Sequence, residues 1–318
     1  MATTETQILD DVIAASRRRM IMMSGTALAG LVLGNAPKAS AQTTLTDTDY
    51  LNFALNLEYL EAEFYTLAST GQTIDQIGIG IGAGTAATGG GTVTVKPTGP
   101  ASCKVPFTIA AVSSYATEIA SEEQKHVTFL RGALGASAVA QPNLDLYNSF
   151  NAAAAAAGIG PAFDPFASDV NFLLGSYIFE DVGVTAYHGA AGLLTSKTNL
   201  GAAAGILAVE AYHAGLIRTV LWGLDQATPS AGIAAATVKI SNLRAALDGT
   251  NNDDVGLTTV QDALNGTTAN YTASTIVNAD SNTIAFSRTT QQVLNIVYAS
   301  ASGMKGGFFP NGLNGNIS

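Results

Sequence analysis

Cysteine and charge are both scarce in this sequence. One cysteine occurs among 318 residues, which excludes an internal disulfide framework and any zinc or iron–sulfur site built from several thiolates. Charged residues make up 12% of the chain, about half the usual globular proportion. The 24 acidic residues outnumber the 14 basic ones, and the net charge of -10 argues against a nucleic-acid partner. The 47% of hydrophobic residues is ample for a packed core, which excludes a disordered chain.

The first 41 residues have the features of an export signal. Ser-Arg-Arg-Arg at 16–19 precedes an uncharged run at 20–34, and Ala-Ser-Ala at 39–41 supplies the small residues that a signal peptidase recognises. The apolar run is about 15 residues, shorter than the roughly 20 that a spanning helix needs. The paired arginines predict a twin-arginine signal, with an ordinary secretory leader as the alternative. We expect export to the periplasm or the extracellular space, with no transmembrane anchor after cleavage.

The rest of the chain is predicted to be all-α, with a four-helix bundle over residues 42–225 and an extension over 226–318 that packs on it. The four long helices are expected at 47–70, 108–134, 164–196 and 200–224. A Gly-rich insertion at 72–106 separates the first two helices, and its alternating residues 92–95 suggest one hairpin. An Ala-rich connection containing residues 152–157 leads to the third helix. Further helices are expected in the extension, at 230–247 and 288–300.

Acidic residues on apolar helix faces are the informative feature, because an amphipathic helix normally keeps its charges on the other side. In the first helix, Glu58 and Glu61 lie three residues apart on the apolar stripe. Glu63 lies about 140° around the helix from Glu58, and we expect it to be solvated. In the second helix, Glu123 and His126 form Glu-x-x-His on the apolar face.

The third and fourth helices continue this pattern. Glu180 is the acidic residue on the apolar face of the third helix, and Glu210 and His213 form a second Glu-x-x-His in the fourth. Arg218, one turn further along, is either a partner of a ligating carboxylate or solvated. Either Glu-x-x-His motif alone is common by chance, but the set is not.

Metal ions would explain why acids occupy these faces. An isolated buried carboxylate costs many kcal/mol, whereas four carboxylates balance two divalent cations and two neutral imidazoles complete the coordination. This mixed set of oxygen and nitrogen donors suits iron or manganese. The sequence therefore predicts two iron ions, with manganese as the alternative.

Four segments resemble the exported ferritin-like-domain family related to plant desiccation-associated proteins. They are residues 52–65, 179–187, 205–213 and 306–312. The order Glu, Glu-x-x-His, Glu, Glu-x-x-His is also that of the ferritin-like di-iron carboxylate proteins. The resemblance implies that the metal ligands are Glu58, Glu123, His126, Glu180, Glu210 and His213. It further implies that Tyr65 lies near the di-iron centre as a catalytic residue, and it leaves open whether Glu61 replaces or joins Glu58.

The favoured function is ferrous-iron oxidation or chemistry on dioxygen or peroxide, by a ferroxidase-type or peroxidase-type enzyme that protects the cell envelope. Manganese catalase activity is a close alternative. A second class of function is a structural or desiccation-protective envelope protein in which any metal only stabilises the bundle. The expected partners are metal ions, dioxygen or peroxide, and the chain could form a homo-oligomer, although its insertion and tail argue against a storage cage.

Overall fold

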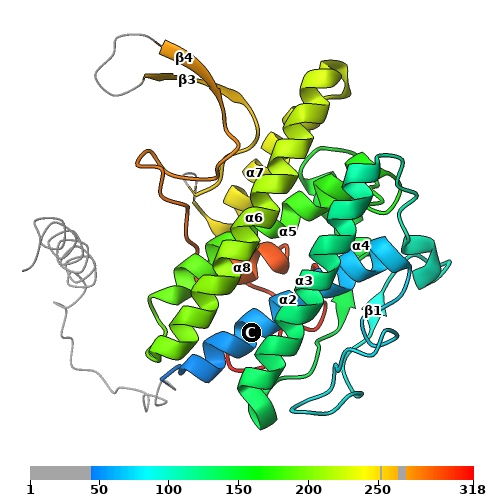
Figure 1. Ribbon diagram of the computed structural model, residues 1–318, viewed down its shortest axis with the longest axis vertical. Coiled ribbons are helices and arrows are strands. Elements are labelled where there is room, and N and C mark those ends of the chain that lie inside the picture. Colours follow the sequence, from blue (N-terminus) through cyan, green and yellow to red (C-terminus); the bar gives the residue numbers. More distant parts are fainter. Residues whose placement is uncertain (1–43, 251–252, 264–269) are drawn as a thin grey trace, which may run out of the picture. The chain divides into compact units, whose positions relative to one another are not determined.

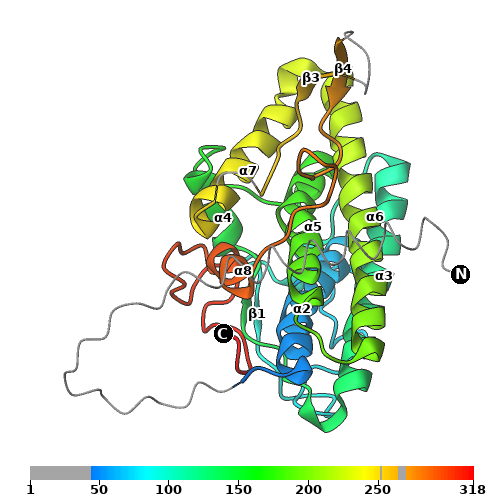
Figure 2. The ribbon, with the colours of Figure 1, turned by 90° about the vertical axis from the view of Figure 1, so that its left-hand side faces the viewer.

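The computed structural model describes residues 44–250, 253–263 and 270–318; the predicted signal at 1–41 lies outside the described residues. The all-α prediction is confirmed for this part of the chain, which is built around four long helices that run side by side (Figures 1 and 2). These helices are α2 (Asp47–Thr70), α3 (Ala110–Leu134), α5 (Asp169–Ala191) and α6 (Lys197–Ala227). α2 packs against α3, α5 packs against α6, and α2 also contacts α5.

Local sequence signals set the ends of these helices. Asp49 accepts a hydrogen bond from the backbone N–H of Thr46 at 2.7 Å at the start of α2, and Gly71 ends the helix with a left-handed φ of 75°. α5 begins at Asp169 because Ser168 caps it, so the prediction of a start at residue 164 was wrong. Pro165 disfavours helical geometry at the residue before it, which explains the later start.

Aromatic side chains fill one end of the bundle. The ring of Phe64 stacks on that of Phe172 with centroids 5.8 Å apart, and it meets Phe179 edge-on at 5.4 Å.

Among the described helices, α6 is long and apolar enough to cross a membrane by length and composition alone. However, α6 buries Glu210, His213 and other polar residues inside the protein, as expected for the core helix of a bundle.

The connections on either side of α3 differ from the prediction. β1 (Val93–Thr94) pairs in parallel with β2 (Leu144–Asp145), so the predicted hairpin within residues 92–95 was wrong. The expected partner was local, whereas the real one lies about 50 residues further along the chain. The Ala-rich connection contains a helix, α4 (Asn148–Ala156), consistent with alanine having the highest helix propensity. Short 3-10 helices occur at Pro100–Cys103, Gly135–Ser137 and Pro229–Ala231.

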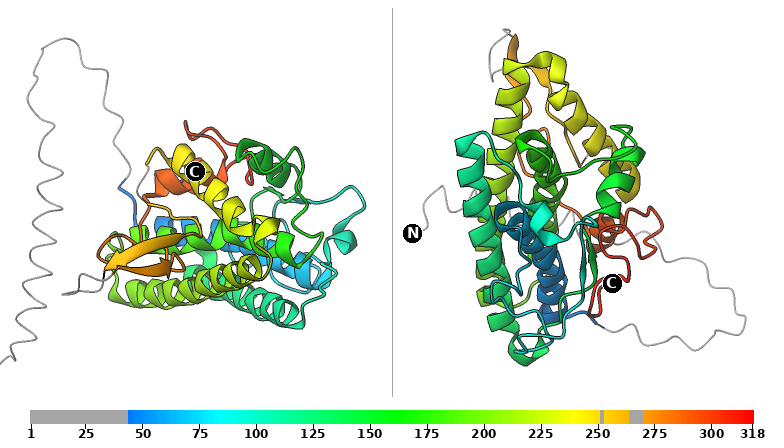
Figure 3. Two further views of the ribbon diagram at one scale, coloured as in Figure 1. Left: turned by 90° about the horizontal axis from the view of Figure 1, so that it is seen from above. Right: turned by 90° about the vertical axis from the view of Figure 1, so that its right-hand side faces the viewer.

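The C-terminal extension packs on the bundle. It contains α7 (Ile233–Asp248), the antiparallel strands β3 (Thr259–Ala263) and β4 (Asn270–Ser274), and α8 (Thr290–Val297). α7 contacts α5, α6 and α8, and α8 also contacts α5. Figures 2 and 3 show α7 and α8 on the side of the bundle away from α3. The β3–β4 pair was not predicted.

Buried ion pairs link the extension to α5 and α6. Asp181 accepts from Arg218 at 2.8 Å and from Arg244 at 2.9 Å, and all three side chains are about 1–2% exposed. Arg288 and Arg244 share Asp254, at 3.0 and 2.6 Å. Arg218 therefore pairs with neither a predicted ligand nor solvent, the two alternatives that the sequence left open. Each buried cation here has a carboxylate partner, as a buried charge requires.

Candidate metal centre

All four bundle helices contribute to one buried polar cluster. The six predicted ligands are Glu58 on α2, Glu123 and His126 on α3, Glu180 on α5, and Glu210 and His213 on α6. Each is at most 9% exposed. On α3 and α6, the three-residue spacing of Glu-x-x-His places both side chains on the inward face.

The first group of ligand atoms surrounds His126. Its Nδ1 lies 3.1 Å from Oε2 of Glu58, 3.3 Å from Oε2 of Glu123 and 3.7 Å from Oε1 of Glu210. One donor atom from each of these four residues lies within 4.8 Å of the others. The group therefore offers three carboxylates and one imidazole to a single cation.

The second group of ligand atoms surrounds His213. Its Nδ1 lies 3.0 Å from Oε1 of Glu123 and 3.4 Å from Oε2 of Glu180, and one ligand atom from each of these three residues lies within 4.8 Å of the others. Glu123 belongs to both groups, with Oε2 toward His126 and Oε1 toward His213. This carboxylate is thus placed to bridge two adjacent ions.

Several buried atoms of the six predicted ligands have no hydrogen-bond partner within the described protein. They are Oε1 of Glu123, Oε2 of Glu180, both carboxylate oxygens of Glu210 and Nδ1 of His213. Leaving such groups unsatisfied is costly, and more so when they are charged. Because the atoms belong to the two ligand groups and are the oxygen and nitrogen donors that iron and manganese accept, the residues fit a dinuclear metal centre.

Electrostatics inside the cluster favour retained protons when no metal is bound. Burial, together with the charge of Glu123, raises the pKa of Glu58 to about 7, and burial raises the pKa of Glu210 well above its ordinary value. Burial alone would lower the pKa of His126, but the neighbouring carboxylates of Glu58 and Glu123 raise it to about 11. Burial opposes ionisation of Glu123, but the neighbouring imidazoles of His126 and His213 lower its pKa to about 2. Cations that enter the site must therefore displace protons.

Two tyrosines orient the carboxylates of Glu180 and Glu58. Tyr65 donates a hydrogen bond to Oε1 of Glu180, which leaves Oε2 for the second group. Tyr187 on α5 donates in the same way to Oε1 of Glu58, whose Oε2 faces His126. The sequence analysis singled out Tyr65 and missed Tyr187, although Tyr187 lies two turns after Glu180 on the same face of α5.

Glu122 is a second residue that the sequence missed. Its carboxylate lies 2.7 Å from Nε2 of His213, opposite the Nδ1 that faces Glu123. Such a carboxylate partner fixes the tautomer and orientation of a metal-binding imidazole. Glu122 lies about 100° around α3 from Glu123, and only the position of α6 brings it to the histidine.

Glu61 joins the cluster at its edge rather than replacing Glu58. Glu58 belongs to the first group and Glu61 to neither, but Glu61 and Glu210 meet beside Gly183 of α5. A Cβ at Gly183 would lie 2.2 Å from Oε2 of Glu210 and 3.4 Å from Oε1 of Glu61. Glycine at this position therefore makes the room that the Glu210 carboxylate occupies.

Glu63 is buried, so the prediction that it is solvated was wrong. Its Oε2 accepts a hydrogen bond from the backbone N–H of Ile74 at 3.1 Å, which places it under the insertion. Burial raises the pKa of Glu63 to about 8. The helical wheel placed Glu63 correctly off the face of Glu58; the insertion covers the face on which it lies.

Comparisons with known proteins agree with this architecture. The ferritin-like domain family matches residues 46–222, a region that contains all six predicted ligands. Desiccation-related protein PCC13-62 of Craterostigma plantagineum is 32% identical over 264 residues, covering 80% of this chain and 79% of the relative. Ferritin-like catalase Nec2 of Nesocodon mauritianus is 30% identical over 279 residues, covering 86% and 85%. No solved structure matches the chain significantly.

Proposed function

Because this chain belongs to the ferritin-like domain family, we propose that it is an oxidoreductase that disproportionates hydrogen peroxide at a dinuclear metal centre. The reaction converts two molecules of hydrogen peroxide into two of water and one of dioxygen. The name of one relative, ferritin-like catalase Nec2, describes this activity. The observation that carries the proposal is the position of Glu123 between the two histidines, with Oε2 facing His126 and Oε1 facing His213.

The contacts of Glu58 and Glu180 suggest how these residues would hold metal during the reaction. Glu58 and Glu180 each lie in one ligand group and would hold the outer side of one ion. Tyr187 and Tyr65 fix these carboxylates through one oxygen each, so that the other oxygen stays directed at the centre. When bound, two adjacent iron or manganese ions supply the exchange of two electrons with peroxide.

Glu61 is the group placed to handle protons. Peroxide reduction takes up protons and peroxide oxidation releases them, so the cycle needs a group that can hold one near the ions. Burial raises the pKa of Glu61 well above its ordinary value, and its carboxyl lies beside Glu210 without belonging to either ligand group. The raised pKa favours the protonated form of Glu61, which can hold a proton without leaving either ligand group.

The metal and the location are part of the same proposal. The four carboxylates and two imidazoles suit two iron ions, with manganese as the alternative. The predicted signal at 1–41 supports action outside the cytoplasm, in the periplasm or the extracellular space. Twin-arginine export would carry the protein already folded, with its metal in place.

Oxidation of ferrous iron by dioxygen is a second candidate function, supported by a groove between α3 and α6. The groove has a volume of about 620 Å³, and its lining includes Glu118, Glu122 and His213. Acidic side chains at a groove that reaches a ligand histidine would attract a divalent cation from solvent. Iron would then be a substrate as well as part of the centre.

Metal analysis and an oxygen electrode test the proposal. Protein folded in the presence of iron or manganese should contain two ions per chain and release dioxygen from hydrogen peroxide. Glu123→Gln should lose metal and activity together, whereas Lys125→Gln, an exposed change on the same helix, should keep both. Dioxygen uptake on adding Fe²⁺, without release from peroxide, would favour the second candidate. Bound metal with neither activity would overturn both and favour the protective role suggested by the name of the desiccation-related relative.

A further inference from the structure

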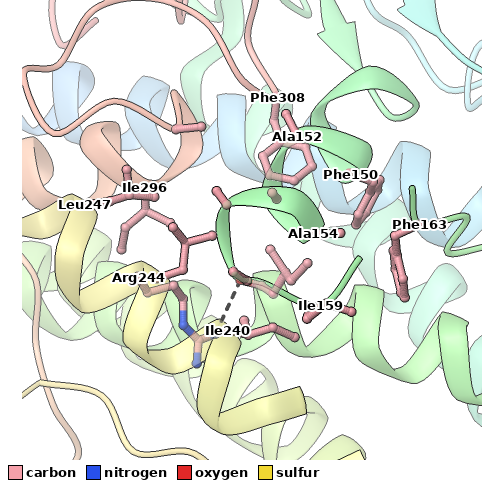
Figure 4. Close-up of a pocket in the computed structure, with 16 residues that line it drawn as sticks. Phe150, Ala152, Ala154, Ile159, Phe163, Ile240, Arg244, Leu247, Ile296 and Phe308 are labelled. Carbon is pink, nitrogen blue, oxygen red and sulfur yellow. Dashed lines mark hydrogen bonds between the residues drawn. The ribbon is translucent and has the colours of Figure 1, made fainter. Parts of the chain in front are cut away.

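An apolar cavity of about 210 Å³ lies beside α4, outside the metal centre (Figure 4). α4 contributes Phe150 and several alanines, including Ala153 and Ala154, and α7 contributes Ile240 and Leu247. Apolar walls of this kind accept small apolar molecules; an engineered apolar cavity of about 150 Å³ binds benzene or xenon. The alanine run, which in sequence looked like a plain connection, thus forms the wall of a cavity.

The one charged side chain in this lining is already engaged. Arg244 donates from Nη1 to the carbonyl of Tyr177 at 2.7 Å and from Nη2 to Asp181 at 2.9 Å, while its Nε lies 2.6 Å from Asp254. No free charge therefore remains for a carboxylate or phosphate group. The cavity selects for uncharged, apolar molecules.

A second, smaller cavity continues from the first toward the metal centre. Its volume is about 20 Å³, and it shares the lining residues Ile178, Ile296 and Phe308 with the larger cavity. Its far wall includes Glu61 and Gly183, the residues that lie against Glu210. The two cavities therefore adjoin, and the three shared side chains mark the constriction between them.

The inner cavity is suited to an apolar diatomic molecule better than to water. A buried water needs two to four polar partners, and the one ionisable side chain in this lining is Glu61. The volume of the inner cavity has room for about one diatomic molecule. Dioxygen is a diatomic molecule and carries no charge.

We propose that the two cavities form the passage by which dioxygen moves between the metal centre and the α4 side of the protein. The inference rests on the proposed function, because dioxygen is the product of peroxide disproportionation. The side chains shared by the two cavities are apolar, as a passage for dioxygen needs. The inner cavity ends at Glu61 and Gly183, beside the predicted ligand Glu210. Ile178, Ile296 and Phe308 determine how fast dioxygen crosses it.

The polar reactant has a separate way in. The groove lined by Glu118, Glu122 and His213 opens between α3 and α6, whereas α4 and α7 lie on the side of the bundle away from α3 (Figures 2 and 3). Hydrogen peroxide forms hydrogen bonds and suits the acidic groove; dioxygen forms none and suits the apolar cavities. The two species would therefore reach the centre from different sides.

Methyl NMR of zinc-loaded protein under dioxygen pressure tests the passage without any catalysis. Dissolved dioxygen is paramagnetic and should enhance the relaxation of the methyl groups of Leu60 and Val182, which line the inner cavity. The methyl groups of Leu55, equally buried but outside both cavities, are the control. Ile178→Phe should suppress the enhancement at Val182 and Ile178→Ala should increase it. Equal relaxation at Leu55 and Val182 in the wild-type protein would overturn the proposal.

Stopped-flow kinetics supply a second readout. With reduced, iron-loaded protein, Ile178→Phe should lower the rate constant for reaction with dioxygen about tenfold, because the ring overfills the constriction. The reaction with hydrogen peroxide should be unchanged. Ala155→Phe, on the exposed side of α4 and outside the cavity lining, should change neither rate. Equal slowing of both reactions would overturn the passage.

The two proposals fail in different ways. If dioxygen enhances methyl relaxation in the inner cavity but the protein has no catalase activity, the proposed function is wrong and the passage stands. If the protein is active but dioxygen does not enhance methyl relaxation beside Glu61, the passage is wrong and the function stands.

Discussion

A methyl group added at Gly183 would disturb the proposed metal centre without removing any predicted ligand. In Gly183→Ala the new Cβ would lie 2.2 Å from Oε2 of Glu210, far inside van der Waals contact. The carboxylate must move by about 1 Å to relieve the overlap. Because Glu210 belongs to the first ligand group, its displacement should act directly on metal binding.

The effect on the metal-free protein is the balance of two terms. Replacing glycine by alanine in an open helical position stabilises a protein by about 0.5–1 kcal/mol. Overpacking in a filled interior costs about 1–3 kcal/mol, so metal-free Gly183→Ala should be between neutral and about 2.5 kcal/mol less stable than wild type. Gly205→Ala on α6 is the matched control, because nothing lies within 4 Å of its added Cβ. It should be more stable by about 0.5–1 kcal/mol.

Metal binding should separate the two variants more clearly. We expect Gly183→Ala to lower the affinity for Mn²⁺ by about 10–100-fold, the usual effect of disturbing the support of a metal ligand, and Gly205→Ala to leave it unchanged. Calorimetric titration with Mn²⁺ and thermal unfolding with and without metal measure both quantities. Wild-type affinity in Gly183→Ala would refute the assignment of Glu210 to the centre.

Four further changes test other parts of the structure. Glu123→Ala should lose both ions and Glu180→Ala one, as counted by elemental analysis, because Glu123 alone is shared; equal losses would contradict the bridge. Metal binding should release protons and tighten as pH rises, since the pKa of His126 is raised to about 11; titration in buffers of different ionisation enthalpy checks this. Glu63 has a pKa of about 8 when folded against an ordinary 4.5, so the native state loses stability as pH rises between these values, by up to about 5 kcal/mol. Urea unfolding across that range should show the loss in wild type and its absence in Glu63→Gln. Asp181→Ala leaves two buried guanidinium groups without this partner and should cost about 3–5 kcal/mol in the same assay, whereas a loss under 1 kcal/mol would show that their other contacts suffice.

Helical periodicity is the reason why the sequence located most of the centre. Glu123 and His126, like Glu210 and His213, share a face because residues three apart always do so on a helix. Their place on apolar stripes indicated that the face is buried. The structure brings all six predicted ligands into two groups that share Glu123.

The errors occur where burial depends on segments distant in sequence. Glu63 was expected in solvent because it lies off the face of Glu58, but α2 is covered on all sides, and the insertion contacts Glu63 through Ile74. Glu122 lies off the apolar face that carries Glu123, and α6 brings His213 to it. The pairing of β1 with β2 likewise joins segments about 50 residues apart. A helical wheel contains no information on which element covers each face.

The sequence by itself determined the all-α class, the family, the four long helices and the pairs of residues that face inward, because each depends on composition or on spacing within one helix. The tertiary structure decided which carboxylate oxygens converge, that Glu123 joins two ligand groups, and that Gly183 leaves space for Glu210. It also decided that an alanine helix borders a cavity leading toward Glu61. These features arise between residues far apart in the chain, so they exist only once the helices have packed.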